Sequence, residues 1–181
     1  MGLDDLDAVL DAVLARLGSM AELGEEFRVP PLDVHRYFRR AVKLHWLPVF
    51  GRALSVVAVV RQPPDLGRSE ADHRALLDRL GRAVHGRFPP LRHGHGLSLG
   101  LTALVLTPEP IFPEDDSLLA AVLTRPPRGR AVPLGLFRLN LGQEAMAFAL
   151  AAGPGGLFRE PQVLADALSE QFGRFVPTLP L

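Results

Sequence analysis

The chain has 181 residues, of which 48% are hydrophobic and 22% charged, a composition typical of a folded globular protein rather than a disordered one. Lys and Arg together number 20, as do Asp and Glu, so the net charge of zero provides no overall field that favours nucleic acid or an anionic membrane. Cysteine is absent, which excludes disulfides, thiolate metal sites and cysteine nucleophiles and favours a cytoplasmic location. We expect one domain over 1–181, with an N-terminal helix and linker over 1–29 and a sheet-containing body over 30–181.

The first segment predicts an amphipathic helix over residues 3–17. Leucine and valine recur every three or four positions, aspartates occupy the first turn, where a helix favours negative charge, and Gly18 is suited to ending the helix. Residues 19–29 are acidic and irregular, and we expect a polar linker or a short helix there. A proline pair then begins a second predicted helix from Leu32 to about His45, because proline is tolerated in the first helical turn.

The middle of the chain predicts two strands separated by a helix. Residues 54–60 form an apolar run rich in β-branched residues, which is typical of a strand buried on both faces. Ser69 and Asp72 have the spacing of a capping box and begin a helix that ends near Gly86. Residues 97–105 alternate between larger apolar and small or polar side chains, and this period of two predicts the second strand.

The C-terminal half predicts a hairpin, a further strand and a closing helix. We expect a β-hairpin over 118–139, with 118–123 as its first strand and a turn at the Pro-Pro-Arg-Gly sequence. Residues 145–151 are predicted as a strand and 161–175 as an amphipathic helix, while 118–123 and 145–151 both admit a helical alternative. This order of elements predicts the α+β class, with a mainly antiparallel sheet of about five strands, helices on one face, and the N-terminal amphipathic helix.

A five-residue string, Gly96-Leu97-Ser98-Leu99-Gly100, matches the G-x-S-x-G pattern of serine hydrolases. In those enzymes a strand precedes the serine, a helix follows it, and the catalytic histidine comes later in the chain. Here a predicted loop over 89–96 precedes the serine, the predicted strand begins at Leu97 and includes Ser98, and all six histidines precede Ser98. The context therefore favours a structural serine over a nucleophile.

His93 and His95 form a candidate metal site, because side chains two residues apart in an extended chain point to the same side. A carboxylate from the acidic segment 114–116 would have to complete the site. The alternative is a pair of exposed or hydrogen-bonded loop histidines.

The most specific polar pattern is a basic stripe. On the second predicted helix the spacing i, i+3, i+4 and i+7 would place four cations on one face: Arg36, Arg39, Arg40 and Lys43. Such a stripe suits a phosphate group, a nucleic acid or an acidic segment of a partner. The alternative is a solvated face neutralised by the chain's own acidic segments, and the zero net charge makes nucleic acid an unexpected partner.

The leading hypothesis is a non-catalytic interaction or regulatory module of a bacterial-type assembly, with another protein chain or a second copy of itself as partner and with no cofactor. It rests on the lack of a consistent catalytic constellation in the sequence. The rivals are an enzyme or a ligand- or metal-binding protein with a site near His93 and His95, and an anion-binding protein that uses the basic segment 36–43. No membrane partner is expected, because the charge-free apolar stretches 97–106 and 145–157 are shorter than the roughly 18 residues that a spanning helix needs.

Overall fold

The computed structural model describes residues 2–18, 21–23, 32–44, 51–87, 99–125, 131–151 and 158–174. The elements in these ranges are, in chain order, α1 (Leu3–Leu17), β1 (Ala21–Leu23), β2 (Val34–Leu44), β3 (Gly51–Arg61), α2 (Glu70–Arg87), β4 (Leu99–Leu106), α3 (Asp115–Thr124), β5 (Val132–Asn140), β6 (Ala145–Leu150), α4 (Glu160–Gln171) and β7 (Gly173–Arg174). No helix within these ranges is both long enough and apolar enough to cross a bilayer.

The strands form one mixed sheet in the order β1-β2-β3-β4-β5-β6-β7. The pairs β1–β2, β2–β3 and β5–β6 are antiparallel, whereas β3–β4, β4–β5 and β6–β7 are parallel. The α+β class is confirmed, and the prediction of a mainly antiparallel sheet is wrong. The physical reason is that α2, α3 and α4 each connect one strand to its parallel neighbour, as a parallel pair requires.

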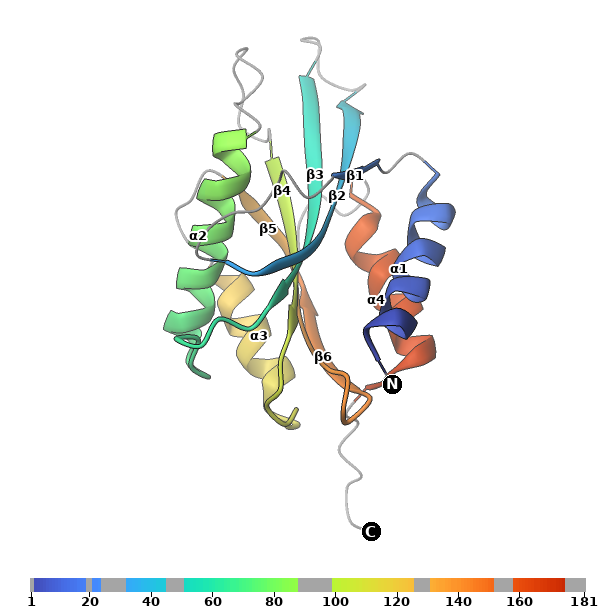
Figure 1. Ribbon diagram of the computed structural model, residues 1–181. Coiled ribbons are helices and arrows are strands. Elements are labelled where there is room, and N and C mark those ends of the chain that lie inside the picture. Colours follow the sequence, from blue (N-terminus) through green and yellow to red (C-terminus); the bar gives the residue numbers. More distant parts are fainter. Residues whose placement is uncertain are drawn as a thin grey trace.

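Helices cover both faces of the sheet, so the prediction of helices on one face is also wrong. One apolar cluster packs α2 and α3 against the sheet, and a second packs α1 and α4 against the opposite face (Figure 1). Right-handed crossovers explain this division. Strands β3, β4 and β5 are parallel and follow one another in the same direction across the sheet. Right-handed connections between them therefore place α2 and α3 on the same face. Strand β6 runs the other way, so the step from β6 to β7 places α4 on the opposite face.

Strand β3 lies between the two apolar clusters, as its composition predicts. Val56 and Val60 belong to the cluster under α2 and α3, whereas Val57 and Val59 belong to the cluster under α1 and α4. All four side chains are buried. The prediction of a strand buried on both faces is therefore confirmed.

Local signals place several helix ends correctly. Helix α1 coincides with the predicted 3–17, and Gly18 ends it in the left-handed region, with φ of 60° and its N–H donating to the Leu14 carbonyl at 3.0 Å. At the start of α2, the hydroxyl of Ser69 accepts from the Asp72 N–H at 3.2 Å, and the Asp72 carboxylate accepts from the Ser69 N–H at 3.3 Å. The predicted capping box is thus confirmed.

Two segments have the opposite secondary structure to the one predicted. Residues 34–44 of the predicted second helix form β2, in which the consecutive aromatics Tyr37 and Phe38 are both buried, on opposite faces of the sheet. Residues 118–123 belong to helix α3 and not to a hairpin strand. The predicted strand at 145–151 is confirmed as β6, and the predicted closing helix is confirmed as α4.

Candidate functional site

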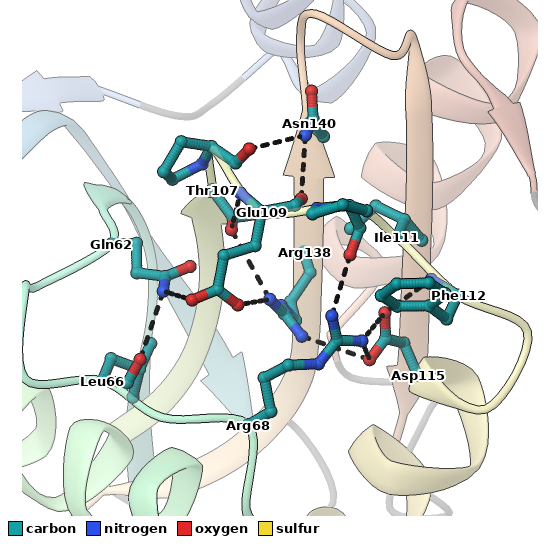
Figure 2. Close-up of polar contacts among 12 residues, drawn as sticks. Gln62, Leu66, Arg68, Thr107, Glu109, Ile111, Phe112, Asp115, Arg138 and Asn140 are labelled. Atoms are coloured by element: carbon teal, nitrogen blue, oxygen red, sulfur yellow. Dashed lines mark hydrogen bonds and ion pairs between the residues drawn. The ribbon is translucent and has the colours of Figure 1, made fainter.

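The C-terminal ends of β3, β4 and β5 meet at one edge of the sheet, because these three strands are parallel. Open sheets with helices on both faces bind their ligands at this edge. Five polar residues gather there, and we call them the carboxyl-edge cluster (Figure 2): Gln62, Arg68, Glu109, Asp115 and Arg138. This cluster is the candidate functional site.

Arg138 lies at the centre of the cluster, on β5, with a side chain only 1% exposed. Its Nη1 donates to Oδ1 of Asp115 at 3.1 Å, and its Nη2 donates to Oε2 of Glu109 at 3.0 Å. Arg68, in the loop before α2, donates to both oxygens of Asp115 at 2.8 and 3.0 Å. Two guanidinium groups and two carboxylates sum to zero charge, which makes the burial of Arg138 tolerable.

Asp115 is the first residue of α3, where the helix favours a negative charge. The backbone N–H of Phe112 donates to its Oδ2 at 2.8 Å, so each carboxylate oxygen accepts two hydrogen bonds. Arg68 also lies over the ring of Phe112, at 4.3 Å from the centroid. Asp115 therefore fastens the start of α3 to β5 and to the loop before α2, and its acceptor sites are fully used.

Glu109 closes the cluster on the solvent side. Its carboxylate accepts from Nε2 of Gln62 at 2.9 Å as well as from Arg138. Its backbone is held separately, because its N–H donates to the Thr107 hydroxyl at 3.0 Å and its carbonyl accepts from Asn140 at 2.8 Å. The side chain is 35% exposed, so Glu109 is the most accessible charged group that contacts Arg138.

His73 is fully buried on α2, where the charges of Arg138 and Asp115 act on it. Its Nδ1–H donates to the Ser69 carbonyl at 2.9 Å, which leaves Nε2 with the lone pair of a neutral ring. Among the described residues, Nε2 has no hydrogen-bond partner. Burial lowers the pKa of His73 and outweighs the hydrogen bond to Ser69, which raises it, while the positive charge of Arg138 lowers the pKa further; burial thus favours the neutral ring.

The basic residues at 36–43 do not form a single stripe, because they lie on a strand. Arg36 donates to Asp7 at 3.2 Å and to Asp11 at 2.8 Å, both on α1. Arg40 forms an ion pair with Glu160, which is fully buried at the start of α4. Strand alternation places Arg39 on the other face, and the side chain of Lys43 lies outside the described part of the chain. Anion binding by these residues stays a prediction, but Arg36 and Arg40 already hold carboxylates.

The remaining predicted site residues, His93 and His95, lie outside the described ranges, as does Ser98. Metal binding by the two histidines therefore stays a prediction. Within the described ranges, no group of three or more His, Asp or Glu residues is arranged to hold a metal ion. Gly100, the last residue of the hydrolase-like string, is inside β4, so a strand and not a helix follows the serine, as predicted.

The carboxyl-edge cluster was not found by sequence reasoning. The available signal is Arg138, the one charged residue in the apolar run 132–139. A charge in such a strand requires a buried partner, and the acidic segment 109–116 is the nearest source in the sequence.

No protein-family model, no curated protein and no solved structure matches the chain. Its function is therefore inferred from the contacts of its own residues.

Proposed function

We propose that the chain is a non-catalytic interaction module whose partner is a second copy of itself, bound along the outer edge of β2. The observation that carries the proposal is the length of this edge. Strand β2 pairs with β3 from Val34 to Leu44, with one irregularity between Val34 and Arg36, whereas within the described residues β1 pairs with it only at Tyr37, Phe38 and Arg39. Residues 41–44 thus extend beyond the described pairing with β1, and the backbone groups along the edge of a sheet are a template to which another strand can add.

The carboxyl-edge cluster supports a non-catalytic function. Its charged groups neutralise one another, and Asp115 uses both carboxylate oxygens twice as acceptors. A general base needs a free lone pair within reach of the proton that it abstracts. The contacts of Asp115 instead fix the β4–α3 loop against β5, which is a structural function.

The charge of β2 is compatible with pairing between two copies. Its four basic residues would repel a second copy if all were unpaired. Asp7 and Asp11 hold Arg36, however, and Glu160 holds Arg40, so α1 and α4 neutralise much of this charge. Two β2 strands can therefore approach each other with reduced repulsion.

Light scattering coupled to size-exclusion chromatography tests the proposal. We expect a mass above the 19.7 kDa of one chain, rising with protein concentration. A constant mass of one chain across the concentration range contradicts the proposal.

Two adjacent proline substitutions, Ala41→Pro and Val42→Pro, provide a matched pair. Neighbouring amides of a strand point to opposite sides, so one substitution removes an outward donor and the other removes a hydrogen bond to β3. We expect the variant that lacks the outward donor to lose self-association, with a melting temperature within a few degrees of that of the unmodified protein. The variant that lacks the hydrogen bond to β3 should have a lower melting temperature. If neither variant reduces the measured mass, the edge of β2 is not the contact surface.

A further inference from the structure

We infer that the carboxyl-edge cluster contains a binding site for a small organic carboxylate, which the side chain of Glu109 fills from within the chain. The inference goes beyond the proposed self-association and does not depend on it. It rests on donors that are held in place independently of Glu109, on the exposure of its side chain, and on the charge that remains when its carboxylate leaves.

The two donors that face the Glu109 carboxylate come from different parts of the fold. Arg138 on β5 donates to one oxygen at 3.0 Å, and Gln62, directly after β3, donates to the other at 2.9 Å. Each donor has a second anchor, because Arg138 is held by Asp115 at 3.1 Å and Gln62 donates to the Leu66 carbonyl at 3.2 Å. The donors are therefore preorganised for a planar group with two acceptor oxygens.

Glu109 can leave this position without any change in the backbone. Thr107 and Asn140 hold its N–H and its carbonyl, so rotation of the side chain alone is sufficient. The side chain is already 35% exposed, whereas that of Asp115 is 3% exposed and accepts four hydrogen bonds. Glu109 is thus the replaceable carboxylate of the cluster, and Asp115 is the fixed one.

The charge that remains selects an anion. Without the Glu109 carboxylate, the two cations Arg68 and Arg138 face the single anion Asp115, which leaves a net charge of one positive unit beside the buried guanidinium of Arg138. Cβ of Glu109 stays in place when the side chain rotates and is retained in Glu109→Ala, so the space left is that of one methylene group and a carboxylate. Acetate has this composition, apart from one terminal hydrogen, and is the matching probe.

The first experiment measures acetate binding to Glu109→Ala. We expect acetate to raise the melting temperature of this variant, whereas acetamide, a neutral molecule of nearly the same shape, has no effect at equal ionic strength. Glu114→Ala is the matched control, because Glu114 lies exposed in the same loop and its side chain does not cap α3. Equal responses of the two variants, or no response of Glu109→Ala, overturn the inference.

The second experiment titrates the unmodified protein with acetate and follows the side-chain amide signals of Gln62 by NMR. If Glu109 vacates the site for about a tenth of the time or less, the affinity of the unmodified protein is at least tenfold weaker than that of Glu109→Ala. A saturable shift of the Gln62 signals with this weaker affinity supports displacement of Glu109. Lack of any shift at concentrations that would saturate a site weakened about a hundredfold contradicts it. This titration also tests the inference if Glu109→Ala does not fold.

Discussion

Replacement of Asp115 by asparagine removes the negative charge between two guanidinium groups while it preserves the size of the side chain. The amide nitrogen of the asparagine cannot accept a hydrogen bond, so donors that now face a carboxylate oxygen lose their acceptor. Loss of one partner from a buried ion pair costs about 3–5 kcal/mol. Arg68 is one-third exposed and contributes about 1 kcal/mol at most, so the buried pair with Arg138 determines the effect.

We therefore expect Asp115→Asn to lower the free energy of unfolding by about 3–5 kcal/mol, which corresponds to a fall in melting temperature of about 6–20 °C. Urea denaturation followed by circular dichroism at neutral pH measures this change. Glu114→Gln, in the same loop, should stay within about 0.5 kcal/mol of the unmodified protein. A loss below about 1 kcal/mol for Asp115→Asn would refute the assignment of a buried, mutually paired cluster.

Three further predictions concern other parts of the fold. The pKa of His73 in the folded protein lies below the ordinary histidine value of 6.5, so below that pH the unfolded chain binds more protons at this residue than the folded chain does. The stability that comes from neutral His73 is therefore complete above pH 6.5 and is lost as the pH falls below it. His73→Leu should reduce the change in unfolding free energy between about pH 7 and pH 5, and an unchanged pH dependence would contradict this. Arg40→Gln leaves the fully buried Glu160 without its cation and should lower stability by about 3–5 kcal/mol in urea denaturation, whereas Arg39→Gln should change it by less than about 1 kcal/mol. Val57→Asp places an unpaired carboxylate in the cluster under α1 and α4, with an expected loss of about 3 kcal/mol or more, and an unchanged melting temperature would exclude this location.

Sequence reasoning succeeds where local chemistry alone determines the structure. Helix α1 has its aspartates at the first turn, its apolar residues at helical spacing and Gly18 at its end, and all three signals agree. Strand β3 is apolar on both faces, which only a central strand tolerates over so short a run.

Sequence reasoning fails where distant partners determine the structure. In β2 the spacing of the basic residues imitates a helical stripe, but strand alternation leaves Arg36 and Arg40 on the face covered by α1 and α4, where each pairs with an acid, and places Arg39 on the other face. In α3 the helical signal was present, since Leu119, Val122 and Leu123 are the buried positions. The apolar character of 118–123 concealed this spacing.

The candidate site was hidden for the same reason. Glu109 and Asp115 precede or begin α3, and Arg138 lies 23 residues after Asp115 on β5. Only the parallel pairing of β4 with β5 places Arg138 beside Thr107 and the acidic loop that follows β4. No local spacing rule connects these residues.

Hydrogen exchange along β2 tests the proposed self-association most directly, because it reads the edge itself. At a protein concentration at which light scattering gives the larger mass, the outward-facing amides within residues 41–44 should exchange more slowly than at the lowest concentration measured. Exchange along β2 that does not change with protein concentration would contradict the proposed pairing of two copies.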